Sequence, residues 1–185
     1  MDKFDRIYKL HDILRDLHAE IGQLRSELRG KEGGELYRNT IRRMGADGWL
    51  AVGWPKEHGG QGYAATEQLI FFEEANIAGA PLPFVTISTV GPALMEAGTE
   101  LQKKKFLPGI AAGEIMFAIG YSEPEAGSDV AAMATQAVQT DSGWTLNGSK
   151  TWISNGDLAD FYVVFAKTDP CAGARGISAF IVDAG

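Results

Sequence analysis

Two short polar stretches in the second half of the chain carry residue types that could do chemistry. The first is YSEPEAGSD, residues 121–129, which combines two glutamates, a proline, a glycine and two serines. Pro124 favours an extended backbone at the residue before it, and the GSD segment can expose consecutive backbone N–H groups, which bind phosphate or carboxylate oxygens. These residues leave two interpretations open: an ordinary turn, which is the commoner case, and an anion-binding loop.

The second stretch is SKTWISNG, residues 149–156. Its tryptophan, Trp152, lies beside hydroxyl residues and a small polar turn, and an aromatic ring in such a place could stack on a flat ligand. A core or cross-strand aromatic would show the same local pattern. Both interpretations stay open on this stretch alone.

Three other features are weaker candidates. The glycine-rich stretch WPKEHGGQG, residues 54–62, lacks the G-x-G-x-x-G order and follows no predicted strand, so it indicates tight chain reversal rather than dinucleotide binding. The histidines His11, His18 and His58 have no further ligand at a suitable spacing, so no metal site is predicted. Cys171 has no paired base nearby in sequence and is interpreted as a bystander thiol.

The elements that must position these stretches change in character near residue 114. Before it, apolar residues recur at steps of three and four, the period of an amphipathic helix. Thr99 and Gln102 fit a capping box at the start of one helix. Pro108 is expected to bend or interrupt that helix, and Gly113 to end it. The predicted helices cover residues 4–28, 35–46, 67–77, 84–97 and 99–113.

After residue 114 the sequence changes to short runs of β-branched and aromatic residues, which predict strands. The NG pair at 147–148 lies between two such runs and predicts a type I′ hairpin turn, and DSG at 141–143 predicts another turn. About six strands of antiparallel type are expected, which is fewer than a barrel or sandwich usually needs, so the domain is expected to be cut off. The predicted strands cover residues 115–120, 133–139, 144–146, 150–154, 161–167 and 177–182.

The predicted fold is therefore α+β and multidomain: an N-terminal all-α helical bundle over residues 1–114, then an incomplete antiparallel β-barrel or sandwich over residues 115–185. The net charge of -7 disfavours a nucleic-acid partner, because phosphate neutralisation needs clustered Lys and Arg. A single cysteine permits no internal disulfide, the start lacks the apolar stretch of a signal peptide, and no run approaches the ~20 apolar residues of a membrane span. A cytoplasmic protein without a membrane partner is expected.

Four stretches occur together in a fixed order: WPKEHGGQG, GTELQKKKFLPGIAAGE, FAIGYSEPEAGSD and NGSKTWISNG. With these motifs the chain resembles the acyl-CoA dehydrogenase family from Glu35 to Val182, and the last two motifs are the specific ones. The resemblance implies an acyl-CoA substrate and FAD bound between this β domain and a C-terminal helical domain. The stretch PFVTISTVGP is similar to actinobacterial members, some of which act on CoA esters of steroid side chains.

The resemblance also implies roles for individual residues. The groups at 121–122 would hydrogen-bond the pyrimidine edge of the flavin, Trp152 would pack on its face, and Ser154 would donate a hydrogen bond near N5, which receives the hydride. Gly127 and Ser128 would contact the pyrophosphate or the pantetheine arm of the substrate. The residues implied to bind FAD are Ile119, Tyr121, Ser122, Gly127, Ser128, Trp152, Ile153 and Ser154; those implied to line the substrate site are Leu82, Val85, Thr86, Thr89 and Ser128.

Such an enzyme needs a carboxylate base for the α-proton and hydrogen bonds that polarise the thioester carbonyl, while the flavin takes the hydride. The family's catalytic glutamate lies in the C-terminal helical domain, which is expected to be absent here, so no catalytic residue is assigned. Glu123 and Glu125 are expected to have structural roles. The 185-residue chain is expected to hold FAD poorly and to be inactive alone.

The resemblance further implies a homo- or hetero-oligomer that passes electrons to electron-transfer flavoprotein or to another acceptor. One alternative is a non-catalytic FAD- or acyl-CoA-binding or assembly subunit that needs a partner chain. A regulator with an N-terminal DNA-binding helix is a further alternative, which the acidic net charge disfavours.

Overall fold

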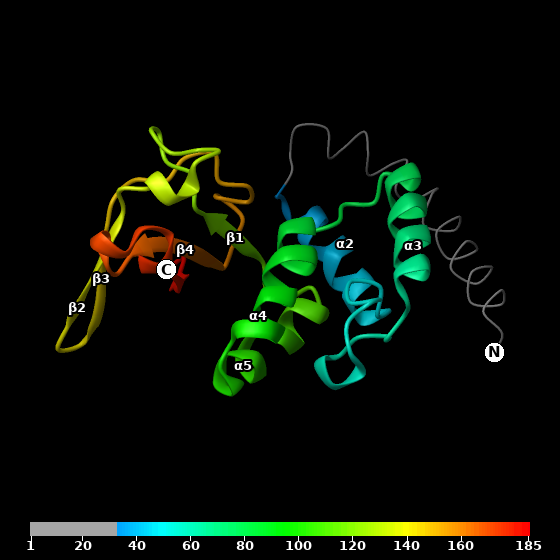
Figure 1. Cartoon of the computed structure of the whole chain (residues 1–185). Coiled ribbons are helices and arrows are strands. Elements are labelled where there is room, and N and C mark those ends of the chain that lie inside the picture. The colour runs from blue at the N-terminus through cyan, green and yellow to red at the C-terminus, as the bar shows by residue number, and fades with distance from the viewer. Residues whose placement is uncertain (1–32) are drawn as a thin grey trace. The chain divides into compact units, whose positions relative to one another are not determined.

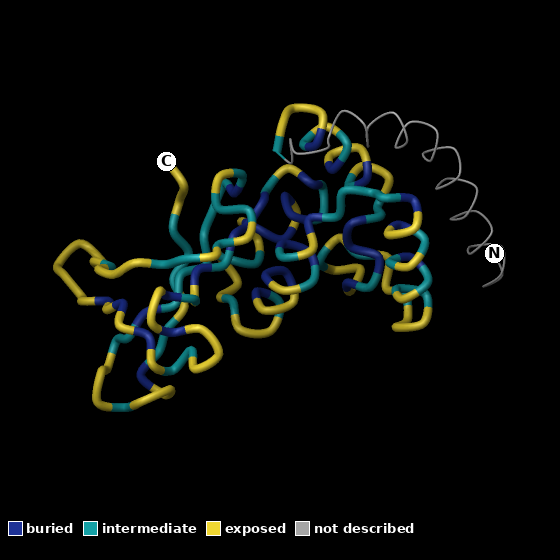
Figure 2. Tube along the Cα trace, turned by 90° about the horizontal axis from the view of Figure 1, so that it is seen from above, coloured by how far each residue is buried: buried dark blue, intermediate teal, exposed yellow. Residues whose placement is uncertain are grey.

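The structure is a computed structural model that describes residues 33–185 (Figure 1). The helix predicted over residues 4–28 lies outside these residues. The chain forms two compact units, one helical and one built on a β-sheet, and the boundary between them falls between Glu114 and Ile115. Figure 2 shows buried residues inside each unit and exposed residues along their outer turns. The fold class, helices followed by a sheet, is confirmed.

The helical unit places its elements close to where the apolar periodicity predicts them. Helix α2 turns Tyr37, Ile41 and Met44 inward and leaves Arg42 and Arg43 exposed, as an amphipathic helix does. The elements of this unit are α2 (Glu35–Ala46), a 3₁₀ turn (Lys56–His58), α3 (Ala65–Ala78), a π-helical segment (Val85–Val90), α4 (Gly91–Ala97) and α5 (Glu100–Ala111).

Capping contacts explain where α3 and α5 begin. The Ala64 backbone N–H donates to the Glu67 carboxylate at 2.8 Å, at the start of α3. At the start of α5 the Gln102 backbone N–H donates to the Thr99 hydroxyl at 3.2 Å, and the Thr99 N–H donates to the Gln102 side-chain oxygen at 2.8 Å. The predicted capping box is therefore confirmed, because both free N–H groups of the first turn gain a side-chain acceptor.

Helix α5 does not stop at its proline. It continues through Pro108 to Ala111, so of the two predicted effects, a bend or an interruption, the interruption does not occur. Pro108 lies on the exposed side of the helix, where water can satisfy the backbone carbonyl that loses its N–H partner. The buried side of the same turn, formed by Phe106, Leu107 and Ile110, anchors the helix in the core of the unit.

The β unit holds one open five-stranded mixed sheet. Its central strand, β4, pairs along its full length with β5, in antiparallel direction. The first half of β4 pairs in parallel with β1, and its last residue pairs in parallel with the first residue of β2. The predicted antiparallel pairing therefore holds only for the β4–β5 and β2–β3 pairs. The strands are β1 (Phe117–Gly120), β2 (Gln136–Thr140), β3 (Gly143–Asn147), β4 (Phe161–Lys167) and β5 (Ile177–Asp183).

Of the two turns predicted in this unit, the structure confirms one and contradicts the other. Strands β2 and β3 pair through the turn at residues 141–142, as the DSG stretch predicts, with Thr140 opposite Gly143. The predicted hairpin at 147–148 was wrong, because residues 150–154 form no strand. Gly148 has φ +157°, far from the φ of roughly +60° to +90° at the central residues of a type I′ turn, and a Cβ there would clash with the Thr135 side chain.

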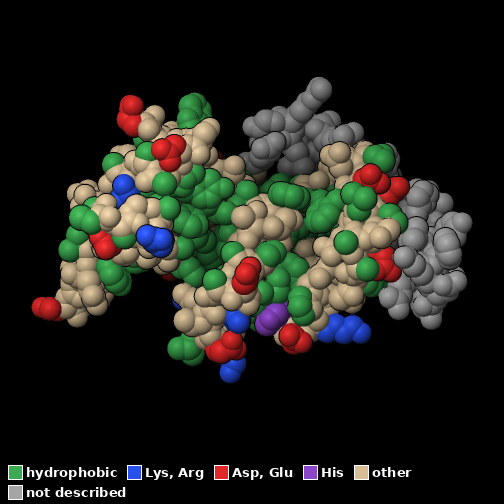
Figure 3. Space-filling model, in the orientation of Figure 1, with side chains coloured by type: hydrophobic (Ala, Val, Ile, Leu, Met, Phe, Trp, Pro, Cys, Tyr) green, Lys and Arg blue, Asp and Glu red, His purple; other side chains and the backbone are tan. Residues whose placement is uncertain are grey.

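No helix within residues 33–185 is long and apolar enough to cross a membrane. On the face shown in Figure 3, the Lys and Arg side chains of the described residues are scattered among other types rather than gathered in one basic patch. The described part of the chain also holds no group of three or more His, Cys, Asp or Glu side chains that could bind a metal ion.

Candidate functional site

The YSEPEAGSD stretch follows β1 directly and contains a tight turn. The Glu123 backbone N–H donates to the Ala126 carbonyl at 2.8 Å, and the Ala126 N–H donates back to the Glu123 carbonyl at 3.1 Å. Pro124 and Glu125 form the exposed tip between them. This closed turn directs the Glu123 side chain inward, although its neighbour Glu125 faces water.

The Glu123 carboxylate is held by donors from two other segments. Its oxygens accept hydrogen bonds from the Ala134 N–H at 2.6 Å, the Thr135 N–H at 3.0 Å, the Thr135 hydroxyl and the Lys150 ammonium at 2.8 Å. Burial by itself raises the pKa of this carboxyl. The hydrogen bonds from Lys150, Thr135 and Ala134 outweigh that effect and lower the pKa of Glu123 to about 2. Glu123 is therefore charged at neutral pH, and its carboxylate is engaged by hydrogen bonds from two other segments of the β unit.

Lys150 brings the two polar stretches together. Its ammonium group donates to the Tyr121 carbonyl at 3.3 Å as well as to Glu123, and it lies 3.8 Å from the Met133 sulfur. The next residue, Thr151, donates its backbone N–H to the Ser122 carbonyl at 2.9 Å. The segments at 121–123 and 150–151 thus lie side by side at the end of β1, which the sequence could not establish.

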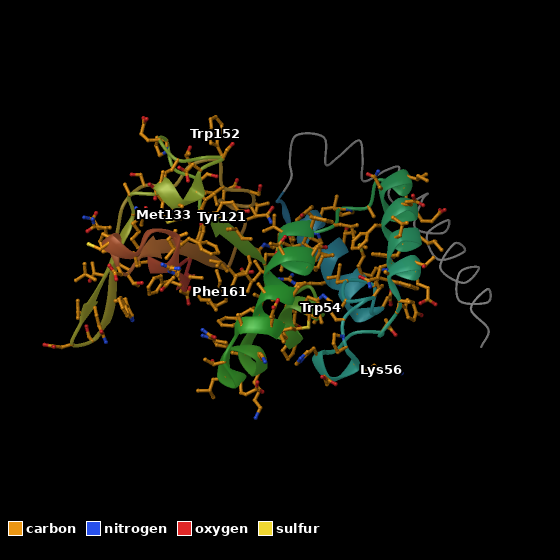
Figure 4. All side chains as sticks on the ribbon, in the orientation of Figure 1. Trp54, Lys56, Tyr121, Met133, Trp152 and Phe161 are labelled. Carbon is orange, nitrogen blue, oxygen red and sulfur yellow. The ribbon has the colours of Figure 1, made fainter. Side chains whose placement is uncertain are left out.

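Trp152, the residue after Thr151, combines a left-handed backbone conformation with an exposed aromatic ring. Its φ is +56° and its side chain is 90% exposed. The left-handed conformation costs a non-glycine residue about 1–2 kcal/mol, and full exposure of an aromatic ring recovers none of that cost within the chain. In Figure 4 the Trp152 ring stands clear of the β-unit ribbon. These features favour the ligand-stacking interpretation of Trp152 over the core interpretation.

The remaining β-unit residues of the predicted site lie in β1 and in the two polar stretches, and they differ in burial. Ile119 lies in β1, Ser122 and Ile153 are half-buried, and Ser128 and Ser154 are exposed. The exposed Tyr121 ring packs edge-on against Phe165 of β4, with 5.5 Å between ring centroids. Gly127 has no left-handed φ, and a Cβ there would meet no atom of this chain within 4 Å, so the chain itself does not require glycine at 127.

The substrate-site residues predicted in the helical unit lie in and beside its π-helical segment. Leu82 and Val85 are half-buried, Thr86 is buried and Thr89 is exposed. A π-helical turn widens the backbone locally and is frequent at functional sites.

Sequence reasoning did not single out the residue that supports this segment. The Trp54 indole N–H donates to the Ile87 carbonyl at 3.1 Å, and a Cβ on Gly91 would lie 2.0 Å from the Trp54 ring. The WPKEHGGQG stretch forms a tight turn, as predicted, in which the Gly62 N–H donates to the Trp54 carbonyl at 2.9 Å. Its Trp54 side chain also supports the π-helical segment. The sign in the sequence that could have indicated this role is a tryptophan directly beside a glycine-rich turn. Lys150 was likewise missed, because a lone lysine in a polar loop gives no sign of burial.

Known proteins match the chain along nearly its whole length. The model of the acyl-CoA dehydrogenase N-terminal domain matches residues 11–114, and that of the acyl-CoA dehydrogenase middle domain matches residues 118–185. Acyl-CoA dehydrogenase FadE26 of Mycobacterium tuberculosis is 52% identical over 162 residues, which cover 85% of this chain and 40% of FadE26.

Solved structures of similar proteins also match this chain. A chain of the ChsE4-ChsE5 complex from Mycobacterium tuberculosis has a TM-score of 0.88 and 48% identity, covering 96% of this chain and 46% of that one. A chain of the Tcur3481-Tcur3483 steroid ACAD has a TM-score of 0.84 and 45% identity, covering 95% of this chain and 48% of that one. This chain spans less than half the length of these relatives. From its motifs, its fold and these matches, we conclude that the chain belongs to the acyl-CoA dehydrogenase family.

Proposed function

We propose that this chain supplies the flavin-facing sheet edge and the acyl-binding helices of a flavin-dependent acyl-CoA dehydrogenase. The reaction is the α,β-dehydrogenation of an acyl-CoA thioester. The single observation that carries the proposal is Trp152, an exposed aromatic ring held in a left-handed conformation beside the end of β1. An aromatic residue in that state is explained by a flat ligand that covers it.

The residues present fit a flavin. Trp152 would cover one face of the ring system, and the backbone and hydroxyl groups of Tyr121 and Ser122 would meet its polar edge. Ser154 would donate a hydrogen bond on the same side. The absence of a side chain at Gly127, where this chain leaves open space, would let a phosphate group approach the backbone. When bound, FAD would accept the hydride from the substrate β-carbon at N5.

The helical unit would hold the acyl group. Leu82 and Val85 offer half-buried apolar surface. Thr86 and Thr89 follow in the π-helical segment, which leads into α4. Trp54 keeps that segment in place through its hydrogen bond to Ile87. We propose a steroid-type acyl group, supported by the 45% identity to a solved protein described as a steroid ACAD.

Neither motif acid would serve as the base. Glu123 already accepts hydrogen bonds from Lys150, Thr135 and Ala134, which stabilise its charge and weaken it as a proton acceptor. Glu125 faces water at the tip of the turn. The carboxylate that removes the α-proton would come from outside these 185 residues, so the isolated chain should show no turnover with any acyl-CoA and an electron acceptor, including electron-transfer flavoprotein.

A second candidate function is a non-catalytic subunit that binds FAD or acyl-CoA only with a partner chain. It is favoured by one observation, that one solved relative is described as the ChsE4-ChsE5 complex and another carries the paired name Tcur3481-Tcur3483. The two candidates differ in where the flavin resides when the chain is purified without a partner.

The test is FAD binding by the purified chain, followed by flavin absorbance and by quenching of tryptophan fluorescence. Trp152→Ala should weaken FAD binding about tenfold or more, whereas Trp144→Ala, which removes another exposed tryptophan from the β2–β3 hairpin, should leave it unchanged. Equal effects of the two variants would contradict the proposed site. Binding that appears only after a partner chain is added would favour the second candidate.

A steroid side-chain CoA ester and a straight-chain acyl-CoA, offered to the same chain, test the acyl group. We expect tighter binding of the steroid ester, and a preference for the straight chain would overturn the proposed substrate class.

A further inference from the structure

The Glu123–Lys150 ion pair connects three separate segments of the β unit. Glu123 lies in the turn after β1, Lys150 precedes Trp152, and Met133 and Thr135 come from the segment that leads into β2. The side chains of Glu123 and Lys150 are only 7% and 12% exposed. By contrast, the Glu100–Lys103 pair on α5 has a glutamate that is 81% exposed.

We propose that the Glu123–Lys150 pair is a positioning device, which sets the Trp152 loop and the 121–122 backbone in one fixed relation before any ligand binds. The inference rests on the proposed function, because it concerns how that same site is preorganised. Neither Glu123 nor Lys150 would touch the reacting atoms. They would act through Trp152 and through the backbone at Tyr121 and Ser122.

The contacts define how the pair would act. One ammonium group holds both the Tyr121 carbonyl and the Glu123 carboxylate, so it fixes the direction of the chain where β1 ends. Thr151 then adds its N–H bond to Ser122, one residue before the strained Trp152. The Lys150 stem also packs against the end of β1, since a Cβ on Gly120 would be in ordinary van der Waals contact with it at 3.4 Å.

A charged pair suits this task better than an apolar contact. Compared with an apolar pair of the same shape, a buried ion pair brings little net stability, because the lost hydration offsets most of the attraction. A hydrogen-bonded pair is directional, however, and its ammonium group has only a few arrangements that satisfy all its acceptors. A mere structural brace should affect exchange equally across the unit, whereas a positioning device should affect most strongly the loop that it holds.

Hydrogen exchange of the ligand-free chain, followed by mass spectrometry, separates these two roles. In Lys150→Met the amide of Thr151 should exchange about tenfold faster or more, because its loop is released. Amides of β4 and β5 serve as the internal control and should be affected less than Thr151, because they exchange only when the whole unit opens. Lys103→Met, which breaks the exposed pair on α5, should change neither region. An unchanged Thr151 amide, or an equal increase in β4 and β5, would overturn the proposal.

Two further variants cover the case in which Lys150→Met folds poorly. Glu123→Gln keeps the shape of the side chain and removes its charge, and Glu123→Gln/Lys150→Met removes both charges together. The double variant should recover folding, since no unpaired buried charge remains, yet its Thr151 amide should still exchange fast. If the double variant protects Thr151 as the parent chain does, the charges position nothing.

FAD added to the same variants gives the second measurement. We expect about tenfold weaker binding and an altered visible flavin spectrum in Lys150→Met, with a non-additive effect in the double variant. If Lys150→Met binds FAD with the affinity and flavin spectrum of the parent chain although its Thr151 amide exchanges fast, then the position of the loop does not affect FAD binding, and that part of the proposal is wrong. If the parent chain binds no FAD while its exchange pattern behaves as described, the proposed function fails and the loop-fixing role of the pair stands.

Discussion

Trp54 in the helical unit and Trp152 in the β unit both lie in loops with turn-forming residues, yet the two loops use their rings in opposite ways. The Trp54 side chain is 6% exposed, and its indole N–H donates to the Ile87 carbonyl. The Trp152 side chain is 90% exposed, its φ is +56°, and it makes no aromatic contact with another described residue. One ring stabilises the chain that carries it, and the other is displayed at the cost of backbone strain.

Contacts inside the helical unit explain the conformation of Trp54, whereas the conformation of Trp152 needs another explanation. Burial of Trp54 and its hydrogen bond explain its position from contacts inside the unit. Nothing inside the β unit gains from the conformation of Trp152, although Lys150 and Thr151 anchor the residues just before it. A strained and exposed aromatic residue held by a well-anchored loop is therefore evidence for something that binds it.

The largest expected effect on stability is that of Trp54→Ala. Loss of the buried ring should lower the free energy of unfolding of the helical unit by about 3–5 kcal/mol, because a cavity forms and the Ile87 carbonyl loses its donor. Trp152→Ala, the matched variant, should change stability by no more than about 0.5 kcal/mol. Urea unfolding followed by far-ultraviolet circular dichroism measures both, and comparable losses would remove the contrast between the two loops.

The next effect concerns the anchor of the Trp152 loop and depends on pH. Since the pKa of Glu123 falls from 4.5 to about 2 on folding, its charge contributes up to about 3 kcal/mol. A lowered pKa means that this contribution is fully present above pH 4.5 and is lost as the pH falls from 4.5 towards 2.

The Glu123→Gln variant should therefore be less stable than the parent chain above pH 4.5, with the gap closing as the pH approaches 2. Unfolding free energies measured across that pH range provide the test. Glu125→Gln, in the exposed tip of the same turn, is the control and should follow the parent chain throughout. A gap in stability that is the same at every pH would contradict the assignment of this charge to Glu123.

The smallest effect has the opposite sign. Trp152→Gly should leave the free energy of unfolding unchanged or raise it by up to about 1 kcal/mol, because glycine adopts the left-handed conformation without a Cβ clash. Asn155→Gly makes a sharp control, since Asn155 also has a positive φ of +62° but donates its side-chain N–H to the Phe117 carbonyl. That variant should lose about 1 kcal/mol. A clear destabilisation by Trp152→Gly, seen in thermal unfolding, would indicate that the exposed ring stabilises the chain after all.

Local patterns predicted much of the secondary structure. The segments at 35–46 and 161–167 were predicted with the bounds that the structure has, because apolar spacing and β-branched runs depend on neighbouring residues alone. The Thr99–Gln102 capping box was predictable for the same reason. The hairpin at 147–148 was not, because Thr151 and Lys150 bond to Ser122 and Glu123 and the segment at 150–154 forms no strand beside β3. Contacts so distant in sequence leave no local sign.

What the sequence by itself determined is the family, the order of helices before strands, and the two motifs that carry the candidate site, since all of these depend on residue types and their spacing. Only the tertiary structure decided that β1 and β4 pair in parallel, that Lys150 joins the two motifs, and that Trp54 is buried while Trp152 is displayed. The physical reason is that burial, buried ion pairs and strand pairing are properties of groups that meet only when the chain folds, and no local pattern of residues specifies which groups will meet.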